Sequence, residues 1–177
     1  MFKKNNLQQL IEIFKNDQNF NKQIAHWHTI DEKPAQLVDL PNEIDERIKK
    51  ALNKRGVEKL YTHQKSAFQL AMEGHSFTAV TPTASGKTLC YNLPVLQTIM
   101  DNPDARALYI FPTKALAQDQ KSELNEIIQE AEVSINSYTY DGDTSANLRQ
   151  KVRNAGHIVI TNPDMLHSAI LPHHTKW

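Results

Sequence analysis

Residues 81–88 read Thr-Pro-Thr-Ala-Ser-Gly-Lys-Thr and fit a phosphate-binding loop, whose pattern is Gly-x-x-x-x-Gly-Lys-Ser/Thr. Such a loop needs an apolar strand before it and a helix after it. The apolar run Phe77–Val80 predicts the strand, and a helix is predicted to begin near Gly86. Thr81 stands where the strict pattern has glycine, so a chance Gly-Lys-Thr at a helix start is the alternative reading.

The residue types in this loop suit the phosphates of a nucleotide. Gly86 lets the backbone wrap closely, and the loop amides with the helix N-terminus offer donors to an anion. Lys87 adds a positive charge for the outer phosphates, and the Thr88 hydroxyl suits a magnesium ion. The expected nucleotide contacts are Thr81, Pro82, Thr83, Ala84, Ser85, Gly86, Lys87 and Thr88, with Lys87 and Thr88 as the catalytic residues and Thr88 as the metal ligand.

From residue 76 onward, short apolar runs alternate with helical patterns. Strands are predicted at 77–80, 105–111, 134–140 and 157–161, and helices from 86, over 113–130, from 144 and from 163. Pro94 should end or kink the first of these helices, because proline lacks a backbone donor and clashes with the preceding turn. The alternation predicts an α/β fold, with a parallel sheet flanked by helices.

The part before this alternation reads as helical. Residues 6–16, 41–55 and 62–74 carry apolar side chains at helical spacing, and glycines follow the second and third segments. The sequence therefore divides into a helical N-terminal extension, residues 1–55, and an α/β domain, residues 56–177.

The composition is that of an ordinary soluble protein, with 177 residues, 40% hydrophobic and 23% charged. Twenty basic and twenty acidic residues cancel, so neither half has the excess of positive charge that binds nucleic acid by bulk electrostatics. No apolar run is long enough to span a membrane, and the N-terminus lacks the pattern of a signal peptide. Cys90 is the only cysteine and is expected in the core. A cytoplasmic location is expected.

Four further segments accompany the phosphate loop in order. They are Tyr-Thr-His-Gln at 61–64, Phe-Pro-Thr-Lys-Ala-Leu-Ala-Gln at 111–118, Tyr-Asp-Gly-Asp-Thr at 140–144 and Thr-Asn-Pro-Asp-Met-Leu at 161–166. With the loop they resemble the Q motif and motifs I, Ia, the glycine motif and Ib of superfamily 2 DEAD/DEAH-box helicases. Residues 81–96 and 171–174 further resemble the mitomycin repair factor A branch, whose members are DNA helicases that move 3′ to 5′ and act in DNA repair.

This resemblance implies a RecA-like P-loop domain that binds ATP with Mg²⁺, in which Gln64 selects adenine. It also implies backbone contacts with single-stranded DNA from Pro112, Thr113, Lys114, Gln118, Gly142, Thr161, Asn162, Pro163 and Asp164. Local chemistry alone favours a simpler reading of Thr113 and Asn162, which is plain capping of the helices that follow them. Residues 141–144 lack the other ligands of a calcium loop and read as a turn with Thr144 as N-cap.

The acidic motif of the family, Asp-Glu-x-His or similar, does not follow Thr161 in this sequence. The chain is therefore expected to be the N-terminal part of a longer helicase, an incomplete first motor domain without the second RecA-like domain and without hydrolysis of its own. A gap in the sheet is expected as well, with poor folding or aggregation. The alternative is a non-catalytic nucleotide- or nucleic-acid-binding module. A different phosphate-loop enzyme, such as a nucleotide kinase, leaves 111–118 and 161–166 unexplained.

Overall fold

The computed structural model describes residues 5–31, 34–82 and 85–177. These residues form two compact units, Met1–Pro34 and Ala35–Trp177. The larger unit therefore begins at Ala35, before the predicted domain boundary at residue 56. Residues 35–55 form a strand and a helix that belong to this unit. Within the described residues, no helix combines the length and the apolar content that crossing a bilayer requires.

The smaller unit contains two helices, α1 (Asn5–Asn16) and α2 (Gln18–Asn21). The helix predicted at 6–16 is confirmed, whereas α2 was not predicted. The Asp17 carboxylate caps α2, because it accepts hydrogen bonds from the amides of Asn19 (2.8 Å) and Phe20 (3.1 Å). The rings of Phe14 and Phe20 stack with centroids 4.4 Å apart and so join the two helices.

The larger unit begins with a two-stranded antiparallel sheet, in which β1 (Leu37–Asp39) pairs with β2 (Lys59–Tyr61). Between them lies α3 (Glu46–Lys54), which starts later than the predicted Pro41 because the Asp45 side chain accepts from the Arg47 amide (2.8 Å) and caps it. After β2 comes α4 (Thr62–Met72), whose N-cap is Tyr61. The pairing of β1 with β2 was not predicted.

A three-stranded parallel sheet forms the centre of this unit, in the order β3 (Ala107–Ile110), β5 (Ile158–Thr161), β4 (Ser137–Thr139). Two helices connect these strands, α6 (Lys114–Glu130) and α7 (Ala146–Ala155). After β5 follow α8 (Pro163–Met165), a π-helical segment η1 (Leu166–Ile170) and a 3-10 segment η2 (Leu171–Lys176). Parallel strands with crossover helices confirm the predicted α/β fold.

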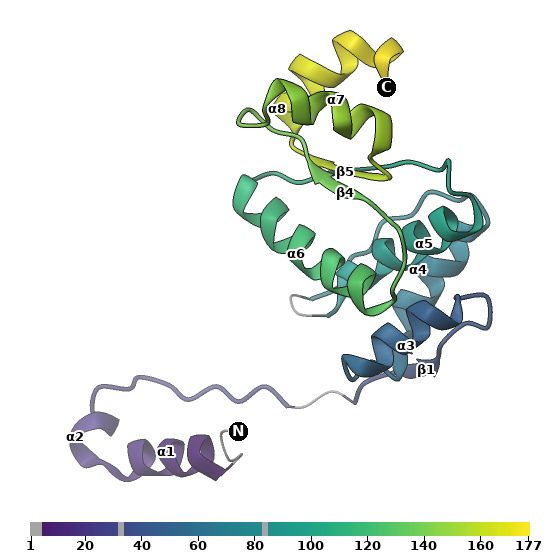
Figure 1. Cartoon of the computed structure of the whole chain (residues 1–177). Helices are drawn as coiled ribbons and strands as arrows, with labels where there is room; N and C mark the ends of the chain where they lie inside the picture. Colours follow the sequence, from purple (N-terminus) through teal and green to yellow (C-terminus); the bar gives the residue numbers. More distant parts are fainter. Residues whose placement is uncertain (1–4, 32–33, 83–84) are drawn as a thin grey trace. The chain divides into compact units, whose positions relative to one another are not determined.

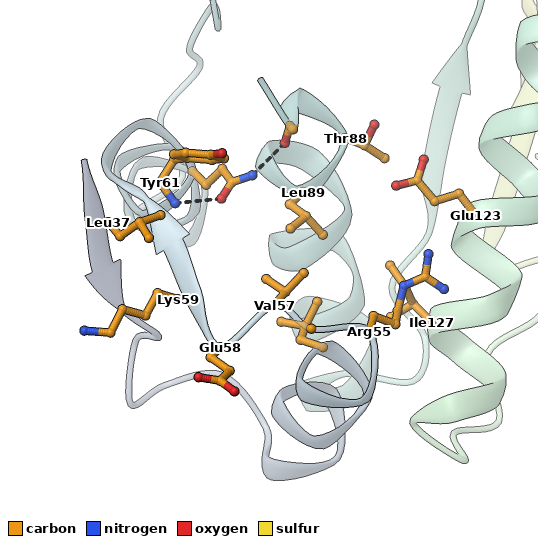
Figure 2. A pocket seen from close by; sticks show the side chains of 14 residues that line it. Leu37, Arg55, Val57, Glu58, Lys59, Tyr61, Thr88, Leu89, Glu123 and Ile127 are labelled. Carbon is orange, nitrogen blue, oxygen red and sulfur yellow. Dashed lines mark hydrogen bonds between the residues drawn. The ribbon is translucent and has the colours of Figure 1, made fainter. Parts of the chain in front are cut away.

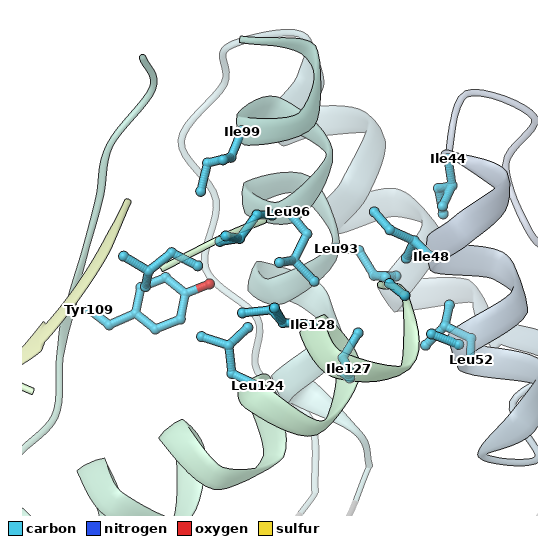
Figure 3. Packing of buried hydrophobic residues seen from close by; sticks show 14 of the residues in the cluster. Ile44, Ile48, Leu52, Leu93, Leu96, Ile99, Tyr109, Leu124, Ile127 and Ile128 are labelled. Atoms are coloured by element: carbon cyan, nitrogen blue, oxygen red, sulfur yellow. The ribbon is translucent and has the colours of Figure 1, made fainter. Parts of the chain in front are cut away.

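Helices cover both faces of this sheet (Figure 1). Successive side chains of a strand point to opposite faces, and β5 follows this rule. Ile158 and Ile160 join the larger core, built with α3, α6 and the long helix α5 (Lys87–Asp101), whereas Val159 joins a smaller core with α7 and the C-terminal helices. Figure 3 shows the larger core, where Leu93 and Leu96 of α5 lie among side chains of α3, α6 and β3.

Neither the predicted strand at 77–80 nor a helix end at Pro94 is found among the described residues. Residues 77–80 form no strand, because no strand among the described residues lies beside them to share ladder hydrogen bonds, and Val80 is 87% exposed. Pro94 does not end its helix, since α5 continues to Asp101. Pro94 has no backbone N–H to donate within the helix. Burial of Leu93, Pro94 and Leu96 stabilises the helix in spite of this missing hydrogen bond.

Candidate nucleotide site and nucleic-acid interface

The end of the phosphate loop leads directly into α5. Gly86 is its N-cap and has a φ of 73°, in the left-handed region that favours glycine. A Cβ at this position would lie 2.5 Å from Nε2 of Gln64, so both backbone and space require glycine. The structure thus explains Gly86 by two independent constraints. Thr83 and Ala84, also predicted in the loop, lie outside the described residues.

The Lys87 side chain folds back over the loop. Its ammonium donates hydrogen bonds to the carbonyl oxygens of Thr81 (2.8 Å) and Pro82 (2.7 Å). The hydroxyls of Thr81 and Ser85 hydrogen-bond to each other (2.5 Å). Hydrogen bonds therefore bring together four of the described loop residues, namely Thr81, Pro82, Ser85 and Lys87.

Thr88 lies in the first turn of α5 and faces α6. Its hydroxyl donates to Oε1 of Gln120 (3.3 Å), and the Tyr91 hydroxyl donates to the same oxygen. Burial raises the pKa of Tyr91, so this phenol stays protonated at neutral pH. Because Thr88 uses its hydrogen towards Gln120, the lone pairs of its oxygen remain for another partner such as a metal ion.

Gln64 is buried beside the loop, with 2% of its surface exposed. Its Oε1 accepts from the Tyr61 amide (2.8 Å), and its Nε2 donates to the Gly86 carbonyl (2.8 Å), as Figure 2 shows. The side chain therefore joins the start of α4 to the start of α5. One amide hydrogen and one lone pair remain, and the predicted contact with adenine depends on them.

A pocket of about 680 Å³ opens beside the Gln64 side chain (Figure 2). Its walls come from the turn after α3, from β2, from the start of α5 and from α6. They include Leu37, Leu52, Arg55, Gly56, Val57, Glu58, Lys59, Tyr61, Gln64, Gly86, Thr88, Leu89, Glu123 and Ile127. The walls mix apolar side chains with a few polar groups, as small-molecule sites do, and the volume is in the range of such sites.

The predicted nucleic-acid segments follow β3, β4 and β5, and the carboxyl ends of parallel strands share one edge of a sheet. Thr113 caps α6, since its hydroxyl accepts from the Leu116 amide (3.2 Å), and Asn162 caps α8, since its Oδ1 accepts from the Met165 amide (2.9 Å). Pro163 is the first residue of α8, as predicted. Thr113 and Asn162 are thus confirmed as helix caps, and their contacts with DNA stay predictions.

One ion pair links two of these segments. The Lys114 ammonium lies 2.5 Å from a carboxylate oxygen of Asp143, and both side chains are more than half exposed. The hydrogen bond from Lys114 lowers the pKa of Asp143, and the same bond raises the pKa of Lys114. Both groups are therefore charged at neutral pH, and the free charge that Lys114 would offer a phosphate is already engaged.

Arg149 of α7 holds the Asp141–Thr144 turn from the other side. Its guanidinium donates to the carbonyl oxygens of Thr144 (2.9 Å) and Asp141 (3.2 Å). The predicted N-cap of α7, Thr144, is wrong. Ser145 caps the helix, because the Thr144 hydroxyl instead accepts from the Asp141 amide (2.9 Å).

Thr161 differs from the other predicted contact residues. Its side chain is 2% exposed, and its hydroxyl donates to the Tyr140 carbonyl (2.7 Å). The Thr161 side chain therefore links β5 to the end of β4 and is not available to contact a nucleic acid. The remaining predicted residues lie on the surface or half-buried: Pro112, Thr113, Lys114, Gln118, Gly142, Asn162, Pro163 and Asp164.

Three residues that the sequence did not single out take part in these sites. His63 contacts the loop at the Ser85 carbonyl (3.0 Å), Gln120 accepts from Thr88, and Asp143 pairs with Lys114. His63 stands directly before Gln64 in the segment 61–64, so its position next to a predicted site residue could have pointed to it. Gln120 carries no local signal, since only the packing of α6 against α5 brings it to Thr88. Within the described part of the chain, no three His, Cys, Asp or Glu side chains gather into a metal site.

Comparisons with known proteins agree with this geometry. The profile of the DEAD/DEAH box helicase family matches residues 61–177. The chain is 65% identical to the uncharacterized ATP-dependent helicase YprA of Bacillus subtilis over 99% of its length, and 36% identical to the ATP-dependent helicase HRQ1 of Saccharomyces cerevisiae over 96%. It spans 23% and 16% of the lengths of these two relatives.

A solved structure gives the same result in three dimensions. The crystal structure of the DUF1998 helicase MrfA bound to DNA and AMPPNP matches 96% of this chain with a TM-score of 0.87 and 65% identity, over 23% of its own length. A helicase RecA-like fold, a phosphate loop at the start of α5 and the family profile over two thirds of the chain agree. The chain belongs to the DEAD/DEAH box helicase family.

Proposed function

We propose that this chain is the ATP-binding part of an ATP-dependent DNA helicase that moves 3′ to 5′ and acts in DNA repair. One observation carries the proposal. The phosphate loop opens α5 next to a pocket of about 680 Å³ that reaches Gln64 and Thr88. A nucleoside and its phosphates therefore find adjoining places on one surface.

The adenosine half of ATP fits this pocket. Tyr61 and Gln64 line the pocket, and Val57 and Leu89 supply apolar wall. The spare hydrogen and lone pair of the Gln64 amide match the adenine edge, which offers a donor beside an acceptor. Gln64 also donates a hydrogen bond to the Gly86 carbonyl. A base bound to Gln64 would therefore be coupled to the phosphate loop through this side chain.

The phosphates then lie at the N-terminus of α5, where amides and the helix dipole favour an anion. Lys87 exchanges the carbonyls of Thr81 and Pro82 for phosphate oxygens, trading neutral acceptors for charged ones, which form stronger hydrogen bonds. Thr88 fits as the magnesium ligand. Its hydroxyl donates its hydrogen to Gln120, so the lone pairs of the oxygen remain for the ion. The ion, when bound, neutralises charge that builds up on the phosphates.

A DNA strand is proposed for the edge where β3, β4 and β5 end. Helix N-termini at Lys114 and Pro163 can hold backbone phosphates without reading sequence and without a basic patch, which suits the neutral net charge. One relative supports DNA as the nucleic acid, since two solved structures of MrfA are bound to DNA. The direction of travel and the repair role rest on the resemblance to the mitomycin repair factor A branch.

The experiment measures ATP affinity by calorimetry for the 177-residue chain and for Lys87→Ala, with Lys50→Ala, an exposed lysine of α3, as control. A loss of about tenfold or more is expected for Lys87→Ala alone, because a charged hydrogen bond contributes about 1.5–3 kcal/mol. Equal affinities of Lys87→Ala and the unchanged chain would contradict an ATP site here.

Hydrolysis separates the helicase from the alternative, a non-catalytic nucleotide- or nucleic-acid-binding module. The isolated chain is expected to bind ATP without turnover, because in-line attack needs charge stabilised from both sides of the phosphoryl group. A longer protein containing this chain is expected to hydrolyse ATP when single-stranded DNA is added, and to stop when Lys87 is replaced by alanine. Absence of DNA-stimulated hydrolysis in that protein would favour the binding module.

A further inference from the structure

The first turn of α4 holds two consecutive carbonyl groups of the phosphate loop. Nε2 of His63 lies 3.0 Å from the Ser85 carbonyl oxygen, and Nε2 of Gln64 lies 2.8 Å from that of Gly86. A carbonyl only accepts, so the ring nitrogen of His63 is the donor. Two neighbouring residues of one helix thus bind two neighbouring peptide groups of another segment.

Both donors are themselves held in place. The Gln64 amide accepts from the Tyr61 backbone through its other end (2.8 Å). The imidazole of His63 stacks on the Tyr61 ring, with centroids 5.5 Å apart and planes 12° apart. His63 is half-buried and Gln64 is buried, so neither side chain is a loose surface group.

Fixing these carbonyls fixes the amides that follow them. In a trans peptide the C=O of one residue and the N–H of the next point in opposite directions. With the carbonyls of Ser85 and Gly86 turned towards α4, the amides of Gly86 and Lys87 turn away from α4. The same contacts keep two negative carbonyl ends out of the space that an anion needs.

We propose that His63 is a positioning residue of the phosphate loop, which acts with Gln64 to aim the amides of Gly86 and Lys87 at the nucleotide phosphates. The proposal rests on the proposed ATP site. It assigns His63 an effect on phosphate binding and none on the base. A purely structural role for His63, as packing for α4, would instead affect every ligand and the stability of the fold alike.

The test uses calorimetry on the 177-residue chain with ATP, pyrophosphate and adenosine as separate ligands. The variants are His63→Ala, His63→Gln, which keeps an N–H donor, and His75→Ala, an exposed histidine just beyond the other end of α4. His63→Ala is expected to weaken ATP and pyrophosphate about fivefold, the effect of one hydrogen bond, and to leave adenosine unchanged. His63→Gln should recover most of the loss, and His75→Ala should match the unchanged chain.

Three results would overturn the proposal. Equal losses for ATP and adenosine in His63→Ala would show a structural role. Failure of His63→Gln to recover phosphate binding, while adenosine still binds, would show that the N–H donor of His63 is not what orients the loop. Unchanged ATP affinity in His63→Ala would show that the contact does nothing for the loop. If the unchanged chain binds neither ATP nor pyrophosphate, the proposed function itself fails, which the other outcomes do not imply.

Discussion

Gly86 is held as glycine in the phosphate loop by both its backbone and its surroundings. It combines a φ of 73° with a position that leaves no room for a Cβ beside the Gln64 amide. That amide cannot retreat easily, because it is buried and bonded at both ends. Backbone strain and crowding therefore act together at one residue.

Gly86→Ala is expected to weaken ATP binding at least tenfold, because the clash moves Gln64 and the loop carbonyl that it holds. The left-handed backbone alone costs about 1 kcal/mol for alanine. Gly74→Ala is the matched control, since Gly74 has a φ of 78° and nothing within 4 Å of a built Cβ. Calorimetry with ATP and thermal melting of both variants separate the effects. Equal ATP affinity in the two variants would rule out the clash.

Among single residues, the place of Gly86, Lys87 and Thr88 at the start of a helix could be predicted from the sequence because their pattern is local. The partner of Gln64 could not. Its residue type suits adenine, yet the structure bonds it to Tyr61 and Gly86, and Gly86 lies far along the chain. Spacing in a sequence carries no information about which of two chemically suitable partners packing will supply.

At the level of elements, Gln120 connects the nucleotide site with α6. One oxygen of this side chain accepts from both Thr88 of α5 and Tyr91 one turn further on. The N-terminus of the same α6 carries Thr113 and Lys114, which are proposed to meet DNA. A single helix therefore links the residues proposed for the two ligands.

Gln120→Leu removes the oxygen that accepts from the Thr88 and Tyr91 hydroxyls, at a cost of about 0.5–1.5 kcal/mol of stability for the lost hydrogen bonding. The gain in ATP affinity on adding Mg²⁺ is expected to fall about fivefold, since the Thr88 hydroxyl loses its orientation. Gln129→Leu, an exposed position on the same helix, serves as control. Calorimetry with and without Mg²⁺ gives the result, and an unchanged magnesium effect in Gln120→Leu would remove Gln120 from the metal site.

The ion pair of Lys114 with Asp143 joins the segments that follow β3 and β4. Asp143→Asn frees Lys114 for a DNA phosphate, so the affinity for single-stranded DNA should rise. The slope of log affinity against log salt should steepen by about 0.7, the value for one phosphate contact. Lys114→Ala should lower the affinity, because it leaves the Asp143 carboxylate unpaired near the proposed DNA. Salt titrations by fluorescence anisotropy measure this, and a weaker complex with Asp143→Asn would contradict it.

The pH dependence of that pair follows from the two pKa shifts. Because the pKa of Asp143 is lowered, its carboxylate charge, and with it the ion pair, is lost only as pH falls below about 3.8, the ordinary pKa of aspartate. The raised pKa of Lys114 means its contribution is lost only as pH rises above about 10.5. The effect of Asp143→Asn on DNA affinity should therefore be the same at pH 6 and pH 8.

Elements were predicted well where the signal is local and poorly where it is not. The caps at Thr113 and Asn162 follow from residue type next to an apolar pattern. The pairing of β1 with β2 could not be predicted, because three-residue strands carry no pattern and pair across α3. Residues 77–80 show the converse, since their apolar pattern suits a strand but no neighbouring strand pairs with them.

For the whole molecule, β3 is an edge strand of the three-stranded sheet and carries exposed apolar side chains. β3 pairs with β5 on one side, and no strand among the described residues pairs with its other side. Leu108 and Ile110 are 43% and 45% exposed. Next to the start of β3 lies an apolar pocket of about 280 Å³, lined in part by Phe77, Tyr91 and Pro94. An apolar strand edge of this kind recruits other chains.

The 177-residue chain is therefore expected to self-associate as its concentration rises, with melting that is broad and dependent on concentration. Replacing Leu108 and Ile110 together by threonine keeps strand propensity and removes exposed apolar surface, so it should lower light scattering while circular dichroism keeps its shape. Leu148→Gln, which changes an exposed leucine on α7, should leave scattering unchanged. A sharp melting transition that does not depend on concentration in the unchanged chain would show that this edge does not drive self-association.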